Sequence, residues 1–166
     1  MNFLKNFQEF KNHLHKKNNI LYLIIVIIIF FLDRFSKISV LNNFKDSTYY
    51  INSFINFDLI WNIGIGFGLF STNTNIIYSL ITTIIALVII FLLYIFVMSE
   101  TLDKFIYAII IGGALGNFYD RLIYKAVPDF IDLHYNNFHW FTFNVADIFI
   151  TMGIFAFILR SFFIKN

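Results

Sequence analysis

The feature that most constrains this chain is the stretch from Ile76 to Met98, which contains no charged residue. About 20 consecutive apolar residues are enough for a helix to cross the hydrocarbon core of a bilayer. The whole chain of 166 residues is 59% hydrophobic and only 13% charged, which leaves too little polar surface for an ordinary soluble domain. The sequence therefore predicts an integral membrane protein.

Three further apolar stretches predict additional spans. A helix that begins near residue 18 is long enough if it continues through Asp33 and Lys37 to Leu41, and these two charged residues then share a face. We expect four transmembrane helices, covering about residues 18–41, 75–98, 104–118 and 145–164. The predicted fold is an all-α membrane protein, with residues 1–166 forming one integral membrane domain.

The distribution of basic residues predicts the orientation. Lysines cluster before the first span, and basic residues near span ends tend to stay in the cytoplasm, so both termini are expected there. Residues 42–75 and 119–143 then lie outside. The first of these loops alternates apolar and polar residues, which predicts short strands and turns. The second carries Trp140 and other aromatic residues, which predicts an interfacial loop at the membrane surface.

Aspartates gather on the predicted outer side. Only Asp103 falls inside, whereas the outer set comprises Asp33, Asp46, Asp58, Asp120, Asp129, Asp132 and Asp147. Asp147 lies at the start of a predicted span, where an ionisable residue is costly and suggests function. A capping role for Asn144 and Asp147 at the helix N-terminus is an equally good interpretation. The spacing of Gly112 and Gly116 predicts close packing of the third and fourth spans.

Two carboxylates that share one site cannot both ionise easily, so one keeps a proton while the other takes one from water. This is the chemistry of aspartic peptidases, and it requires neither a metal nor a cofactor. Cysteine is absent and no HExxH pair is present, so thiol and zinc peptidases are disfavoured. We expect His134 and His139 to be interfacial polar residues. A small proton- or ion-coupled transport subunit is the alternative, because intramembrane carboxylates also relay protons.

Four motifs occur in order along nearly the whole chain: DRFSK from Asp33, NIGIGFG from Asn62, GNFYDR through PDF from Gly116, and FNVAD from Phe143. Together they resemble the lipoprotein signal peptidase (signal peptidase II) family, aspartic peptidase family A8. The resemblance implies four membrane helices with a small extracytoplasmic sheet. It also implies a monomeric enzyme of the bacterial inner membrane that cleaves lipid-modified prolipoproteins before the diacylglyceryl-cysteine, without nucleic acid as a partner.

The resemblance also implies roles for individual residues. Topology alone leaves Asp120 and Asp129 as possible partners of Asp147, and the family motif selects Asp129 and Asp147 as the catalytic pair. Supporting or substrate-binding roles are implied for Asp33, Lys37, Asn62, Gly64, Asn117, Asp120, Arg121 and Asn144. Asp132 is expected to be a solvated surface charge. Lys125, Pro128 and Gly66 depart from the residues usual in the family.

Overall fold

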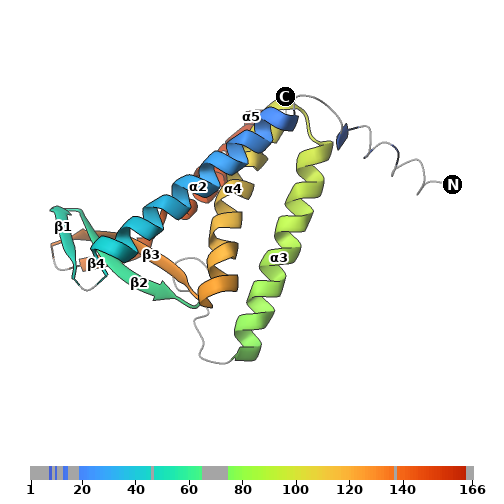
Figure 1. Cartoon of the computed structure of the whole chain (residues 1–166). Helices are drawn as coiled ribbons and strands as arrows, with labels where there is room; N and C mark the ends of the chain where they lie inside the picture. The colour runs from blue at the N-terminus through green and yellow to red at the C-terminus, as the bar shows by residue number, and fades with distance from the viewer. Residues whose placement is uncertain are drawn as a thin grey trace.

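The computed structural model describes residues 8, 10, 13, 14, 19–45, 47–64, 75–136 and 138–163. Its four long helices are α2 (Asn19–Asn43), α3 (Asn75–Met98), α4 (Thr101–Tyr124) and α5 (Val145–Phe163). Its strands are β1 (Tyr49–Asn52), β2 (Ile55–Asn62), β3 (Val127–Tyr135) and β4 (Phe138–Phe143). The fold is therefore mostly helical, with a small antiparallel sheet beside one end of the helices (Figure 1).

The exterior of the helices is apolar. Large hydrophobic side chains such as Phe35, Ile76, Leu122 and Phe162 are between 59% and 82% exposed, which suits a helix whose solvent is lipid. Within the described residues, α3 and α5 are the helices that qualify as membrane spans by length and composition alone. Helices α2 and α4 contain 25 and 24 residues, or roughly 36 Å at 1.5 Å per residue, but each carries buried charges.

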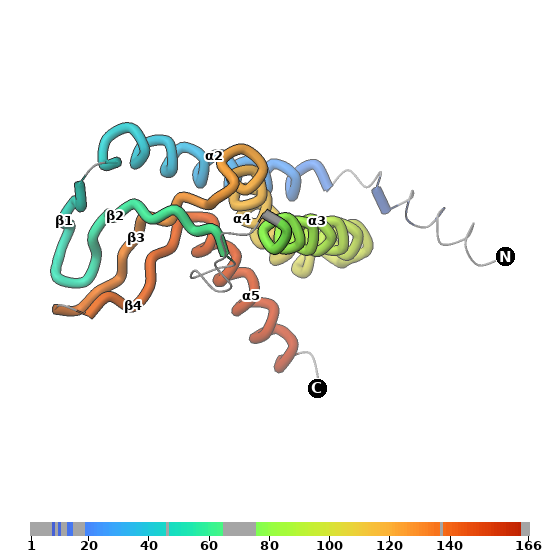
Figure 2. The backbone as a smooth tube through the Cα atoms, turned by 90° about the horizontal axis from the view of Figure 1, so that it is seen from below, coloured from blue at the N-terminus to red at the C-terminus, as the bar shows by residue number. Residues whose placement is uncertain are grey.

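Helix α4 lies at the centre and packs against α2, α3 and α5 (Figure 2). Glycines allow two of these approaches. A Cβ at Gly112 would lie 2.8 Å from the Cβ of Ile29 on α2, and one at Gly113 would lie 2.6 Å from the carbonyl oxygen of Ala146 on α5. Gly116 faces Asp33 on α2. The prediction that Gly112 and Gly116 pack against the fourth span was therefore wrong, because both glycines face α2, the first span. Gly113 is the glycine that faces α5, the fourth span.

The sheet has the strand order β1-β2-β3-β4, and every neighbouring pair is antiparallel. Pairing of β2 with β3 joins two segments that are far apart in sequence, with Asn62 opposite Val127 and Ile55 opposite Leu133. The expected strands before Asn75 are present. The prediction of a loop at residues 119–143 was wrong, because α4 continues to Tyr124 and most of the remaining residues form β3 and β4. The edge of β2 supplies the hydrogen-bonding partner that the segment needs.

Two of the unusual residues lie between α4 and β3. Lys125 ends α4 in the left-handed conformation, with φ 55° and ψ 23°, which explains why glycine would be suitable there. Pro128 lies opposite Trp61 of β2, in a part of β3 that has no partner in β4. A strand with one free edge accommodates a residue that lacks an N–H group. Gly66 lies outside the described residues.

Candidate active site

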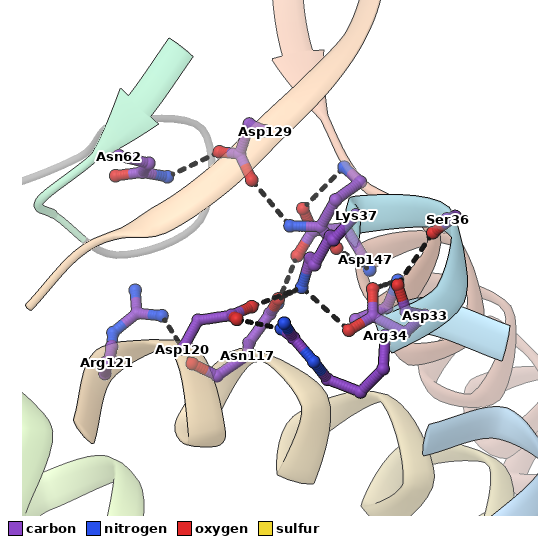
Figure 3. A network of polar contacts seen from close by, with 12 residues as sticks. Asp33, Arg34, Ser36, Lys37, Asn62, Asn117, Asp120, Arg121, Asp129 and Asp147 are labelled. Carbon is purple, nitrogen blue, oxygen red and sulfur yellow. Dashed lines mark hydrogen bonds and ion pairs between the residues drawn. The ribbon is translucent and has the colours of Figure 1, made fainter. Parts of the chain in front are cut away.

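The polar site forms where the ends of five elements meet. The C-terminal parts of α2 and α4, the end of β2, the start of β3 and the first turn of α5 each contribute side chains (Figure 3). Each of the four sequence motifs contributes residues to this junction. Every residue predicted for the site belongs to this junction, although the residues separate into two groups of different chemistry.

Asp129 lies on β3 and is only 2% exposed. Its Oδ2 accepts a hydrogen bond of 2.8 Å from Asn62 Nδ2, and its Oδ1 accepts one of 2.5 Å from Asn144 Nδ2. Burial and, to a smaller extent, the nearby Asp147 carboxylate together raise the pKa of Asp129 from 3.8 to about 7, against the lowering effect of the two amides. A group with this pKa can exchange a proton near neutral pH.

Asp147 occupies the first turn of α5. Its Oδ1 accepts a hydrogen bond of 2.8 Å from Asn117 Nδ2, and its Oδ2 accepts one of 3.1 Å from the backbone N–H of Asn144. The backbone N–H of Asp147 in turn donates to Asn144 Oδ1 at 3.1 Å. This reciprocal pair is a capping box. The predicted capping role is therefore present, and it leaves Asp147 Oδ1 directed at Asn117.

Asn144 connects the two aspartates. It is fully buried, and it donates its side-chain amide to Asp129 and its backbone N–H to Asp147. Its position directly before α5 fixes the backbone, while the sheet fixes Asp129. A single residue thus holds one carboxylate oxygen of each acid. Among the described residues, no salt bridge reaches either of these two aspartates.

The second group is ionic and centres on Lys37. Its Nζ lies 2.8 Å from Asp33 Oδ2, 2.7 Å from Asp120 Oδ2 and 2.8 Å from Asn117 Oδ1. The contacts with Asp33 and Asn117 are hydrogen bonds, and the contact with Asp120 is an ion pair. Arg34 forms an ion pair with the other oxygen of Asp120. The Asp33, Lys37 and Asp120 side chains are fully buried.

This ionic group is joined to the aspartate pair by hydrogen bonds. Asn117 accepts from Lys37 and donates to Asp147, while Asp33 Oδ1 accepts from the backbone N–H of Ala146 at 2.9 Å. The ionic group therefore fixes α5 against α2 and α4. Arg34 was not among the predicted residues, although an arginine in a long apolar segment is itself a signal of a buried partner.

Arg121 supports the site from the end of α4. It donates to the backbone carbonyl of Gly64 at 2.5 Å, and the N–H of Gly64 donates to Asn62 Oδ1 at 2.9 Å. Asn62 then reaches Asp129. The contacts form a chain from α4 through the end of β2 to the carboxylate, which is consistent with a positioning role for Arg121.

An apolar groove of about 260 Å³ lies beside Asp147, between β4 and α5. It is lined by Phe141, Phe143, Asp147, Ile148, Thr151 and Met152. Asp147 is the one ionisable residue in this lining, and its side chain also belongs to the hydrogen-bonded site. The groove therefore brings an apolar surface next to the carboxylate pair.

The structure corrects the expectation for Asp132 and His134. Asp132 is only 3% exposed, and His134 is 6% exposed, so neither is a solvated or interfacial group as predicted. Asp132 Oδ2 lies 2.7 Å from His139 Nδ1. Both residues of this contact lie in the sheet, in the segment that was expected to be a loop. Asp132 and His134 are buried in this sheet, whereas the His139 side chain stays 59% exposed.

Comparison with known proteins identifies relatives of this chain. The family model for signal peptidase (SPase) II matches residues 25–163. A lipoprotein signal peptidase from Pelagibacter ubique is 48% identical over 158 residues, covering 93% of this chain and 95% of that protein. One from Francisella tularensis subsp. novicida is 42% identical over 120 residues, covering 70% and 74%.

Two solved structures are also similar to this chain. A bacterial membrane enzyme determined at 2.3 Å resolution matches with a TM-score of 0.71 and 26% identity, covering 86% of this chain and 87% of that one. A second, at 1.9 Å, matches with a TM-score of 0.69 and 25% identity, covering 85% and 92%. These similarities favour a peptidase over the alternative of a transport subunit.

Proposed function

The chain belongs to the signal peptidase II family, a family of bacterial inner-membrane peptidases, and we propose that Asp129 and Asp147 are its catalytic pair. The observation that carries this proposal is the bridge made by Asn144, which hydrogen-bonds one oxygen of each aspartate. Both acids are held by neutral groups and so remain able to exchange a proton. The buried aspartates Asp33 and Asp120 instead form ion pairs with Lys37 and Arg34.

The proposed reaction uses one shared proton. With its pKa raised to about 7, Asp129 can hold or release the shared proton near neutral pH. The ionised carboxylate takes a proton from water as the water oxygen attacks the peptide carbonyl carbon, and the protonated carboxyl donates to the carbonyl oxygen. The first carboxyl, now protonated, then gives its proton to the amide nitrogen, the C–N bond breaks, and the other carboxylate takes back a proton from a hydroxyl of the tetrahedral intermediate. The asparagines keep both carboxylates oriented throughout these steps.

The substrate that we propose is a lipid-modified prolipoprotein, cleaved before its diacylglyceryl-cysteine. The relatives are named lipoprotein signal peptidases, and the apolar groove beside Asp147 suits an apolar part of such a substrate. We assign this groove to the substrate segment next to the scissile bond. Phe141, Phe143 and Met152 would contact it while the peptide carbonyl lies between the two aspartates.

We further propose that all four long helices cross the membrane, with the sheet and the aspartate pair at the outer face and both termini in the cytoplasm. The buried charges of α2 and α4 are paired or hydrogen-bonded, which lowers the cost of placing them at membrane depth. At the opposite end of the helices, Lys104 on α4 donates to Asn19 at 2.7 Å and to the carbonyl of Val97 at 3.0 Å. A basic residue at that end fits the cytoplasmic side.

The substrate assignment is tested with the full chain reconstituted in lipid vesicles. Wild type is expected to cleave a lipidated prolipoprotein and to leave the unlipidated precursor uncut. The Asp129→Asn and Asp147→Asn variants are expected to cleave neither. Asp58→Asn makes the same change of charge on β2, where Asp58 contacts Thr48 on an exposed surface, and should match wild type. Equal cleavage of both precursors by wild type contradicts the substrate assignment, and full cleavage by either site variant contradicts the pair.

The topology has its own test, because the chain contains no cysteine. Single cysteines introduced by Ser53→Cys, in the turn between β1 and β2, and by Glu100→Cys, between α3 and α4, occupy exposed positions. A membrane-impermeant thiol reagent added to intact cells should label the first and spare the second. Labelling of both, or the reverse pattern, contradicts the proposed orientation.

A further inference from the structure

We propose that Asp132, His134 and His139 form a binding site for a divalent transition metal, with Zn²⁺ as the best match. One possible ligand atom from each residue lies within 4.8 Å of those from the other two. Two imidazoles and one carboxylate are a common ligand set for zinc in proteins. The site is separate from the catalytic pair, because Asp129 and Asp132 are three positions apart on β3 and therefore point to opposite faces of the sheet.

The strand geometry explains how these three residues meet. Asp132 and His134 are two positions apart on β3, so both side chains point to the same face. Leu133 pairs with Phe141, whereas His134 pairs with His139, so the register shifts by one residue between the two pairs. A regular ladder would instead have placed His139 opposite Tyr135, on the other face. The irregularity in β4 therefore brings His139 beside His134, as a β-bulge can.

The buried polar atoms of the cluster lack enough partners. His134 is 6% exposed, and its Nδ1 has no hydrogen-bond partner among the described residues; Asp132 Oδ2 is 3.5 Å away. Asn56 lies opposite Asp132 in the β2–β3 ladder, and its buried Oδ1 also has no partner there. Buried polar atoms in folded proteins are nearly always satisfied. A cation next to Asp132 would supply the missing partner for His134.

The distances are compatible with coordination after a small adjustment. Ligand atoms about 2 Å from a tetrahedral zinc ion lie roughly 3.3 Å from one another. The separation from Asp132 Oδ2 is 3.5 Å to His134 Nδ1 and 2.7 Å to His139 Nδ1, so the second contact must lengthen. The ligand atoms of the two histidines lie within 4.8 Å of each other, and rotation of the exposed His139 ring can adjust that separation. The His139 side chain is 59% exposed, which gives the ion a route from solvent and leaves a position for water.

The expected role of the metal is structural. It would fix β4 to β3 next to the register shift, and β4 leads directly to Asn144, which holds both catalytic aspartates. Binding requires an ionised carboxylate and neutral imidazoles, and the cluster supplies one carboxyl group and two imidazole rings. The metal proposal does not depend on the peptidase mechanism, since none of its three residues contacts Asp129 or Asp147 in the hydrogen bonds described above.

The test is a Zn²⁺ titration of the full chain, purified in detergent without a histidine tag, against a competing chromophoric chelator. One ion per chain is expected. His139→Gln changes an exposed side chain and should preserve the fold, yet it should weaken binding at least about tenfold, the loss that even an outer partner of a metal ligand can cause. The other two histidines of the chain, His13 and His15, provide the matched control, because the double variant His13→Gln/His15→Gln should bind as wild type does.

A second readout reports the geometry of the site. Co²⁺ bound tetrahedrally absorbs visible light much more strongly than Co²⁺ bound octahedrally, so wild type and the His13→Gln/His15→Gln variant should give an intense band that His139→Gln lacks. Zn²⁺ affinity that is equal in wild type and His139→Gln overturns the proposal. So does binding that disappears in the control variant, or a wild type that binds no ion. In those cases Asp132 and His139 form a hydrogen bond only.

Discussion

Two groups of buried aspartates lie side by side in this molecule, and they are satisfied in different ways. Asp33 and Asp120, on α2 and α4, contact the cations Lys37 and Arg34. Asp129 and Asp147, on β3 and α5, are held by asparagine amides and a backbone N–H. All four positions look alike in the sequence, since each is an acid in or next to an apolar segment.

The difference separates structure from chemistry. A carboxylate next to a buried cation forms an ion pair and helps to fix the helices against one another. A carboxylate held by neutral donors, next to a second carboxylate, shares a proton that it can give or take. Asn117 lies between the two groups, with its oxygen on Lys37 and its nitrogen on Asp147. The ionic group therefore orients the pair without neutralising it.

The largest effect is expected from changing the aspartate pair. Asp129→Asn and Asp147→Asn should each reduce kcat by about a thousandfold or more, near the upper end of the range for general acid–base groups. Because the two acids act as a unit, the double variant should be no slower than the slower single variant. Single-turnover cleavage of a lipidated prolipoprotein measures this. If the fold-losses in kcat of the two single variants multiply in the double variant, the acids act independently. That result would contradict a proton shared between Asp129 and Asp147.

The second effect concerns the ionic group. Asp120→Asn leaves Lys37 and Arg34 with one less negative charge in a buried setting, where loss of one partner typically costs about 3–5 kcal/mol. The free energy of unfolding in detergent should fall accordingly, while the folded fraction still cleaves the precursor. Asp129→Asn should show the opposite pattern, with a stable fold and no cleavage. If Asp120→Asn abolishes turnover without lowering stability, Asp120 takes part in the chemistry.

The third effect is the pH dependence of Asp129. Its pKa is raised from 3.8 to about 7, so between these pH values the folded protein holds a proton that the unfolded chain has released. By linkage, this contribution to stability is complete below pH 3.8 and is lost as the pH rises to about 7. The free energy of unfolding of wild type should therefore decline over that pH window more than that of Asp129→Asn. Thermal unfolding of both proteins at a series of pH values measures this difference.

The same ionisation should limit catalysis. Above about pH 7 Asp129 is ionised, so the pair loses the proton that Asp129 supplies and kcat/KM should fall tenfold per pH unit at the limit. Asp58→Asn, as a matched change on β2, should keep this profile. A rate that stays level well above pH 8 would show that the raised pKa of Asp129 has no part in the reaction.

The sequence predicted some of this arrangement, and physical reasons account for what it missed. Apolar runs indicated the helices, and the contact of Asp33 with Lys37 followed from their spacing on one helix face. Strands β3 and β4 were missed, because a strand at residues 127–135 depends on β2, more than 60 residues earlier. Burial of Asp132 and the position of His139 depend on that sheet and its register shift, which no local pattern reveals.

The smallest effect tests the link between the two groups. Lys125 lies between Arg121 at the end of α4 and Asp129 on β3, with φ 55°. A left-handed conformation costs a residue with a Cβ about 1–2 kcal/mol, whereas glycine adopts it readily but loses more backbone entropy on folding. Lys125→Gly should therefore raise the free energy of unfolding by about 1 kcal/mol or slightly less and leave kcat unchanged. Chemical denaturation and single-turnover assays measure the two quantities.

Lys125→Ala, which keeps a Cβ, is the matched control, and its free energy of unfolding should not rise. If Lys125→Gly slows cleavage, the rigidity of this connection matters to the geometry of the pair, and the two groups are coupled through the backbone as well as through Asn117.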